Sequence, residues 1–168
     1  LERGMSTLEV KAIQAPSGFE LEMPTGHIVQ SVSSTYAPTG SDVTITATSY
    51  TDSGLSATIT PKASGNKIII VCSLNAITFA DTGGDADGWN SLALDGTTLV
   101  ERRWNGDNLG KLGDSIYFPY SSGFQYTHTT TNANAHTFKV RIKCDAANRW
   151  HRLKQQMTST MLLMEVQG

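Results

Sequence analysis

The stretch Thr48 to Leu74, TSYTDSGLSATITPKASGNKIIIVCSL, carries the strongest structural signal in the chain. Its first half alternates apolar residues, Leu55, Ala57 and Ile59, with Ser and Thr, a period of two that is typical of a strand with one buried face. Its second half, Ile68 to Cys72, is a short β-branched apolar run, which indicates a strand buried on both faces. The stretch therefore predicts two strands.

The segment between these strands, Pro61 to Asn66, has the composition of a turn. Pro61 has no backbone N–H to donate, and Gly65 tolerates a positive φ. We therefore predict that the two strands pair as a β-hairpin. The second strand should lie in the middle of a sheet, with Ile70 and Cys72 facing the core.

The composition of the 168 residues agrees with a β protein. The chain is 39% hydrophobic, which suffices for one domain with its own core, and only 17% charged. Serine, threonine and glycine are frequent, which favours short strands joined by polar turns over helices rich in Glu, Lys and Arg. The net charge of −2 excludes proteins that bind nucleic acid or acidic lipid through a strongly basic surface.

Further strands follow at regular intervals. Asp95-Gly96 is the strongest two-residue hairpin signal, because a type I′ turn requires positive φ at both central positions. We predict an all-β fold, an antiparallel jelly-roll sandwich of about 8–10 strands. The other predicted strands are His27 to Ser33, Val43 to Ala47, Trp89 to Leu94, Thr97 to Arg102, Ser115 to Tyr120, Gly123 to His128, His136 to Cys144 and Ser159 to Val166.

The N-terminal residues differ from the rest of the chain. Two short alternating pieces flank the break Ala15-Pro16-Ser17-Gly18, and a segment of this size cannot form a core of its own. We predict three parts: residues 1–4, a scar or an upstream extension; residues 5–24, an N-terminal attachment arm; and residues 25–168, the β-sandwich domain. The apolar residues of the arm are Leu8, Val10, Ile13, Phe19, Leu21 and Met23.

The two cysteines, Cys72 and Cys144, each end an apolar alternation. We predict buried, reduced thiols, with a disulfide between facing strands as the alternative. The N-terminus lacks a charged region followed by an apolar core, and no run reaches the roughly 18 apolar residues that span a bilayer. We therefore expect a protein made in the cytoplasm, without a secretion signal and without membrane insertion.

The chain as a whole resembles small structural proteins of tailed bacteriophages, the kind labelled tail-fibre or virion structural proteins. The resemblance covers most of Met5 to Val166 and lies in the shared order of five segments: MSTLEVKAIQ from Met5, SYTDSGLSATITPKASGNKIIIV from Ser49, ALDGTTL from Ala93, HTFKVRIK from His136 and STMLLMEV from Ser159. It implies a trimeric jelly roll, similar to the heads of complement C1q and tumour necrosis factor, attached to the virion through its N-terminus.

The chain departs from that pattern in two ways. It has no long fibrous shaft, and the segment Asp145 to Gln156 is rich in Arg and Trp instead of Gly and Ser. Because the shaft is missing, a capsid decoration protein is an alternative to a tail fibre.

The sequence contains no Gly-x-Ser-x-Gly elbow, no phosphate-binding loop and no HExxH spacing. We predict no enzymatic activity, no cofactor and no metal. Asp81, Asp85 and Asp87 form a weak calcium candidate, because hard cations prefer clustered carboxylate oxygens, but the EF-hand spacing is absent. His128 and His136 can face each other across the turn that joins their strands.

Aromatic and arginine residues gather in two segments. Indole rings stack on sugar faces and guanidinium groups bind carboxylates or hydroxyls in a forked geometry, so these segments are candidates for contact with a receptor. The same residue types are favoured in subunit interfaces, which is the alternative. The candidate residues are Arg102, Arg103, Trp104, Arg149, Trp150, His151 and Arg152.

Two functions agree with these features. In the first, a homotrimer attached to the virion by its arm binds a host-surface glycan through its loops, and multivalency strengthens weak single contacts. In the second, the trimer is a capsid decoration protein whose arm holds neighbouring capsid subunits together. A lectin-like or glycan-active host domain is a third, weaker alternative. The expected partners are further copies of the chain, a tail or major capsid protein of the virion, and a glycan, but no nucleic acid.

Overall fold

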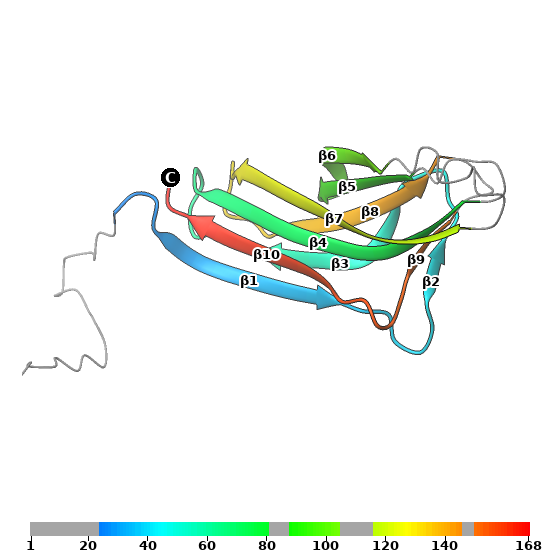
Figure 1. The fold of residues 1–168 in the computed structure, drawn as a ribbon. Coiled ribbons are helices and arrows are strands. Elements are labelled where there is room, and N and C mark those ends of the chain that lie inside the picture. Colours follow the sequence, from blue (N-terminus) through cyan, green and yellow to red (C-terminus); the bar gives the residue numbers. More distant parts are fainter. Residues whose placement is uncertain (1–23, 81–87, 105–115, 146–149) are drawn as a thin grey trace, which may run out of the picture.

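The computed structural model describes residues 24–80, 88–104, 116–145 and 150–168. They form two antiparallel β-sheets that pack face to face (Figure 1). The predicted antiparallel β-sandwich is confirmed, and its strand order is compatible with a jelly roll. Sheet A has the order β1 (Ile28–Tyr36), β10 (Ser159–Val166), β4 (Lys67–Ala80), β9 (Trp150–Leu153) and β2 (Val43–Ile45), and β7 (Ile116–Thr129) pairs with the other edge of β4. Sheet B has the order β3 (Thr51–Ile59), β8 (His136–Cys144), β5 (Gly88–Leu94) and β6 (Thr97–Trp104).

The predicted hairpin between the first two strands is wrong. β3 lies in sheet B and pairs with β8, whereas β4 lies in sheet A between β10 and β7. The segment 60–66 therefore crosses from one sheet to the other. An alternating pattern specifies a strand and its buried face, but it does not specify the partner strand. The central position of β4 is confirmed, with Ile70 and Cys72 in the core.

A buried carboxylate, Glu165, holds this crossing segment in place. Glu165 on β10 is 0% exposed and accepts hydrogen bonds from Asn66 Nδ2 at 2.6 Å, from the Lys62 backbone N–H at 2.7 Å and from Gln30 Nε2 at 2.5 Å. Burial alone would raise the pKa of Glu165, but these bonds and the backbone amide of Ala63 lower it overall. The carboxylate is thus charged in the fold and fixes the path of the chain between the sheets.

The core lies between the two sheets and draws residues from both. Phe138, Val140 and Ile142 of β8 face it from sheet B, as predicted from their alternation. Cys72 and Cys144 are both buried and neither forms a disulfide, which confirms the prediction of reduced thiols. No helix in the described ranges is long and apolar enough to cross a membrane.

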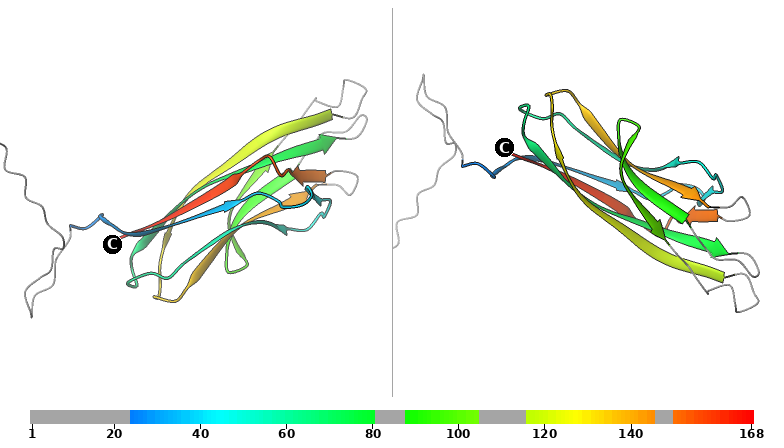
Figure 2. Two further views of the ribbon diagram at one scale, coloured as in Figure 1. Left: turned by 90° about the horizontal axis from the view of Figure 1, so that it is seen from below. Right: turned by 90° about the horizontal axis from the view of Figure 1, so that it is seen from above.

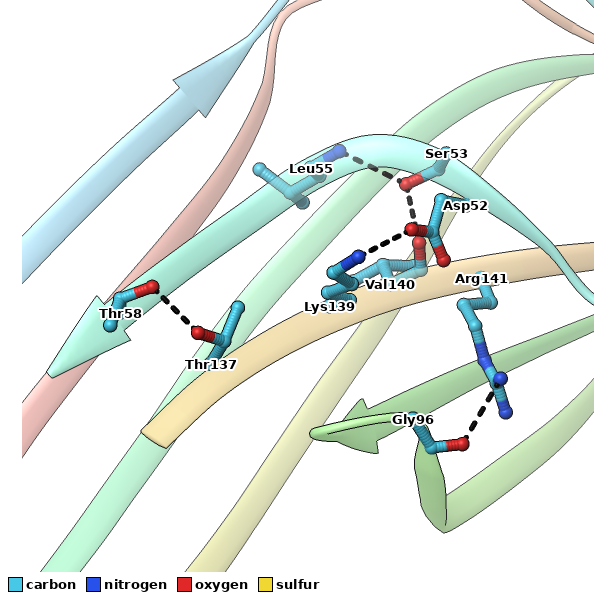
Figure 3. Close-up of polar contacts among 9 residues, drawn as sticks. All are labelled: Asp52, Ser53, Leu55, Thr58, Gly96, Thr137, Lys139, Val140 and Arg141. Atoms are coloured by element: carbon cyan, nitrogen blue, oxygen red, sulfur yellow. Dashed lines mark hydrogen bonds and ion pairs between the residues drawn. The ribbon is translucent and has the colours of Figure 1, made fainter. Parts of the chain in front are cut away.

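Two local features position the strands of sheet B. The turn between β5 and β6 has φ values of 47° at Asp95 and 90° at Gly96, which confirms the predicted hairpin. A bulge interrupts β3, where Ser53 Oγ donates to the Val140 carbonyl at 2.7 Å (Figure 3). Gly54 in this bulge has a φ of 93°, and a Cβ there would collide with the Tyr36 ring.

Two predictions about the second half of the chain need correction. β7 is one strand, not two, because residues 121–123, which have the composition of a turn, pair with residues 73–75 of β4. The hydroxyls of Ser73 and Ser121 share a hydrogen bond of 2.9 Å there. β9 has no counterpart among the predicted strands, because its four residues are too short a run to show a period clearly.

The described chain begins and ends at one end of the sandwich. The backbone N–H of Gly26 donates to the carbonyl of Gln167, and that of Gln167 donates to His27, both at 3.1 Å. The opposite end carries the start of β5 and the end of β6, which pair through Gly88 and Trp104, as well as the start of β9 (Figures 1 and 2). The residues of the predicted attachment arm, 5–24, lie outside the described residues except for Pro24.

Candidate functional site

The structure places the predicted receptor or interface residues at the end of the sandwich away from the termini, but on different faces. Arg102 and Arg103 lie near the end of β6 in sheet B, and both are exposed. Trp150 and Arg152 belong to β9 in sheet A. The side chain of Trp104 and all of Arg149 lie outside the described residues. The two segments thus do not form one site.

The segment in sheet A forms a small cation–π pair. Arg152 Cζ lies 4.2 Å from the centroid of the Trp150 ring, and Arg152 Nε donates to Thr44 Oγ1 at 3.3 Å. Both side chains are partly exposed, so they remain candidates for contact with a partner.

His151, between them, points in the opposite direction. It is 1% exposed and packs against Gly88, where a Cβ would overlap the imidazole. Burial lowers the pKa of His151 to about 4, so the ring is neutral near pH 7. Since its side chain belongs to the core, His151 is removed from the candidate surface.

His128 and His136 face each other from the two sheets, as the sequence suggested. Their ring centroids lie 5.5 Å apart in an edge-to-face arrangement. His136 is 6% exposed, and its Nδ1 lies 4.0 Å from Asp95 Oδ2. Burial, and then the neighbouring His136, lower the pKa of His128. No three His, Cys, Asp or Glu side chains come together as a metal-binding group in the described part of the chain, and Asp81, Asp85 and Asp87 lie outside it.

The lowered histidine pKa values predict an acid-sensitive fold. Below about pH 6.5 both histidines are protonated in the unfolded chain, whereas His128 and His151 stay neutral in the folded protein until a lower pH. The free energy of unfolding therefore has its full value above that pH and decreases as the pH drops toward the folded pKa values. For His151, a fall in pKa from 6.5 to about 4 corresponds to a loss on the order of 3 kcal/mol. Guanidinium unfolding at several pH values measures this dependence of the unfolding free energy on pH.

The matched variants are His151→Gln and His27→Gln. His27 is less buried, and its Nδ1 lies 2.8 Å from the Pro24 carbonyl. The first variant should flatten the dependence of the unfolding free energy on pH between about 6.5 and 4, whatever its stability at neutral pH. The second should leave that dependence unchanged, and equal slopes in both variants would contradict the assignment to His151.

Cations and aromatic rings gather on the outer face of sheet B. We call this group the cation–aromatic cluster; its members are Tyr50, Trp89, Arg103, Arg141 and Lys143. Lys143 Nζ lies 4.5 Å from the centroid of the Tyr50 ring and 5.2 Å from that of Trp89. Trp89 is the cross-strand neighbour of Lys143 in β8 and of Arg103 in β6.

One arginine of the cluster, Arg141, is fixed by the hairpin next to it. Arg141 donates through Nη1 to the Gly96 carbonyl at 3.2 Å (Figure 3). It also donates through Nη2 to Thr98 Oγ1 at 2.7 Å, and its Cζ lies 5.2 Å from the Tyr50 ring centroid. Two residues earlier, Lys139 forms an ion pair of 2.6 Å with Asp52 (Figure 3). β8 thus carries one paired lysine and one arginine that is bound to neutral groups.

The Tyr50 ring covers part of sheet B. Burial raises the pKa of Tyr50 to about 12, and the carboxylate of Glu101 adds to the rise, while Ser91 and Arg141 oppose it. Ser91 beneath it is 0% exposed. Tyr50 therefore stays protonated at any ordinary pH, and its ring acts as a neutral wall for the Lys143 ammonium.

Sequence reasoning identified Arg103 but missed Trp89, Lys143 and Tyr50. Trp89, Lys143 and Arg103 come from separate strands, which the register of β5 against β8 and β6 brings together, and Tyr50 lies directly before β3. One signal was available: Lys139, Arg141 and Lys143 alternate with apolar residues in HTFKVRIK, which places three cations on one outward face.

The outer face of sheet A has the opposite character. Where β1, β10, β4 and β7 lie side by side, its outward residues are serines, threonines, apolar side chains and the amides Asn75 and Gln125, with Lys67 as the charged residue in this described part. Val71 is 41% exposed and Leu162 36% exposed. A groove with a volume of about 430 Å³ runs over residues 33–35 of β1, 160–162 of β10 and 71–73 of β4.

Comparison with known proteins adds little to this geometry. No protein-family model matches the chain, and no curated protein sequence matches it. A solved structure described as the C-terminal domain of EclA, a sugar-binding protein, is 15% identical over 87% of this chain and 86% of that chain, with a TM-score of 0.32. At this TM-score the likeness supports no conclusion about the function of this chain.

Proposed function

We propose that this chain is a non-enzymatic structural protein of a tailed-phage virion: a homotrimeric jelly roll, attached by its N-terminal arm, that acts as a receptor-binding tip. The observation that carries the proposal is the difference between the two ends of the sandwich. The described chain begins at Pro24 and Gly26 is hydrogen-bonded to Gln167, whereas Trp89 and Trp150 lie at the other end. One end is thus suited to attachment and the other to recognition.

The outer face of sheet A supports self-association. Charged residues are depleted in the centres of protein interfaces, and this face has the same depletion across four strands. Its exposed Val71 and Leu162 lie beside an open groove, which a neighbouring copy could fill. The outer face of sheet B, with Lys139, Arg141 and Lys143, is the one that faces solvent in this arrangement.

A charge on the sheet A face should prevent assembly without unfolding the domain. Val71→Asp is expected to convert a trimer into a monomer, because the carboxylate would be buried without a partner in the interface. Mass photometry at micromolar concentration measures the change. Thr58→Asp, a new charge at an exposed position of sheet B, should leave the trimer intact. A wild-type monomer would contradict the homotrimer, and a trimeric Val71→Asp would contradict this choice of face.

Adsorption assays test the recognition function directly. Purified full-length protein should block adsorption of the phage to its host, and virions should contain a few to tens of copies of it. Hundreds of copies per virion, with capsids that lose stability when the protein is deleted but still adsorb, would instead identify a capsid decoration protein. That result would overturn the receptor-binding proposal while leaving the virion assignment in place.

A further inference from the structure

Two histidine rings from different sheets meet beside the turn that joins β7 to β8. His128 lies on β7 in sheet A, His136 is the first residue of β8 in sheet B, and their ring centroids are 5.5 Å apart. This turn lies at the end of the sandwich where the described chain begins and ends (Figure 1). None of the surfaces named above uses either ring.

The ring of His136 is buried without a hydrogen-bond partner. His136 is 6% exposed, and neither of its nitrogens is hydrogen-bonded within the described residues. Buried polar atoms nearly always have a partner, so such a nitrogen indicates a place for a water molecule or a metal ion. His128 is partly exposed, which gives an ion access to the pair from solvent. Edge-to-face packing of His128 on His136 and Phe138 explains the positions of the rings but leaves the nitrogens of His136 unpaired.

The distance between the two rings fits a shared metal ion. A tetrahedral zinc ion lies about 2.0–2.1 Å from each imidazole nitrogen, which places two ring centroids about 5 Å apart. The observed separation of 5.5 Å is close to this value, and small rotations of the side chains supply the difference. Water would complete the coordination, because the described residues do not bring three His, Cys, Asp or Glu side chains together around one ion.

Asp95 is placed to orient the imidazole of His136. Its Oδ2 lies 4.0 Å from His136 Nδ1, and its Oδ1 accepts a hydrogen bond from the backbone N–H of Thr137 at 3.1 Å. A carboxylate beside one ring nitrogen favours the tautomer that carries its proton there, and this leaves the Nε2 lone pair for a metal.

Hydrogen bonds to the segment that crosses between the sheets hold the turn next to His128. The backbone N–H of Thr130 donates to the carbonyl of Asn66, and the N–H of Gly65 donates to the carbonyl of Thr130, both at 2.9 Å. Since His128 and His136 belong to strands on either side of this held turn, an ion would meet a preformed pair of ligands.

We propose that His128 and His136 bind one divalent transition-metal ion of the zinc or copper class, with Asp95 as the residue that positions His136. Imidazole is a ligand that these ions prefer, whereas Mg²⁺ and Ca²⁺ prefer oxygen. Burial, and then the neighbouring His136, lower the pKa of His128, which keeps that ring neutral near pH 7. The ion would crosslink sheet A to sheet B, and this role is independent of the proposed virion function.

The experiment is calorimetric titration of the full-length protein, without a polyhistidine tag, with ZnCl₂ and with MgCl₂ as the comparison. One Zn²⁺ per chain should bind with a Kd on the order of 10 µM, because two imidazoles supply half the ligands of a structural zinc site. His128→Gln and His136→Gln should each weaken binding at least about tenfold. Asp95→Asn, which keeps an Oδ1 acceptor for Thr137, should weaken it about tenfold. His27→Gln is the control and should change binding less than about twofold.

Thermal unfolding separates loss of the site from loss of the fold. Each variant is first compared with wild type in the absence of zinc. Zinc should then raise the Tm of wild type and of His27→Gln but not that of His128→Gln, because a ligand stabilises only a fold that binds it. His128→Gln is the decisive variant, since its ring is partly exposed and its loss is tolerated better than that of the buried His136.

The inference would be overturned if wild type did not bind zinc, if His128→Gln bound it as wild type does, or if His27→Gln lost binding equally. Equal heats with MgCl₂ and ZnCl₂ would also contradict a site made of imidazoles. Unchanged binding in Asp95→Asn would remove Asp95 from the site. None of these results bears on adsorption or on the copy number in virions, so the proposed function is tested separately.

Discussion

Ile70→Asp is expected to abolish folding. Ile70 is 0% exposed and lies in the central strand β4, between Leu163 of β10 and Tyr126 of β7. A carboxylate at this position would lie in the apolar core cluster, and burying it costs several kcal/mol, or forces its protonation. That cost is comparable to the whole stability of a typical domain, about 5–15 kcal/mol. The variant should be insoluble or lack a cooperative unfolding transition by circular dichroism.

The adjacent substitution is the control. Ile69→Asp places the same charge one residue earlier, on the outer face of sheet A, where the side chain is partly exposed in the single chain. This variant should fold and unfold cooperatively, but it should fail to assemble for the same reason as Val71→Asp. If both variants lost the fold equally, the outer face of β4 would have to be covered within one subunit, contrary to the structure.

Glu165→Ala is expected to destabilise the domain by about 3 kcal/mol or more. Removal of the carboxylate leaves the Asn66 amide and the Lys62 backbone N–H without this acceptor, while Gln30 Nε2 keeps the Thr60 carbonyl; a buried donor left without an acceptor costs about 1–3 kcal/mol. The segment that crosses between the sheets would then lose the group that fixes it. Urea unfolding at neutral pH gives the free energy directly.

Two further measurements check the role of the Glu165 charge. Because the folded pKa of Glu165 is lowered, its contribution should be complete above the unfolded pKa and disappear as the pH falls through the folded pKa. The difference between wild type and Glu165→Gln should therefore shrink in acid. Gln30→Ala removes only one donor, whose side chain is partly exposed, and should cost less. A constant difference at all pH values would mean that shape, not charge, explains the effect of Glu165.

The existence of most strands could be predicted from the sequence, because alternation of apolar side chains is a local property. Ile70 and Phe138 are examples: each lies in the core on the predicted face of its strand. The pairing of strands could not be predicted in the same way. β3 and β4 are neighbours in sequence but belong to different sheets, and the contacts that decide this come from Glu165, about a hundred residues further along the chain.

The candidate site shows the same limit. Arg103 was a candidate from its local sequence, and its aromatic neighbour there is Trp104, but the pairing of β5 with β6 places it opposite Trp89. His151 was a candidate for the same reason, yet the alternation of β9 turns it into the core against Gly88. Composition thus indicated which residue types take part, whereas register determined which of them meet.

The described chain begins and ends at the same end of the sandwich (Figure 1), which has a mechanical consequence. A pull between residue 24 and the far end of the domain runs along β1, which is hydrogen-bonded to β10 from Ile28 to Tyr36. The bonds of an antiparallel pair lie perpendicular to the strands, so this pull loads all of them together in shear instead of opening them one at a time. A head that tethers a particle to a cell through residue 24 would resist force along its long axis, whereas a sideways pull on β1 would peel it from the sheet.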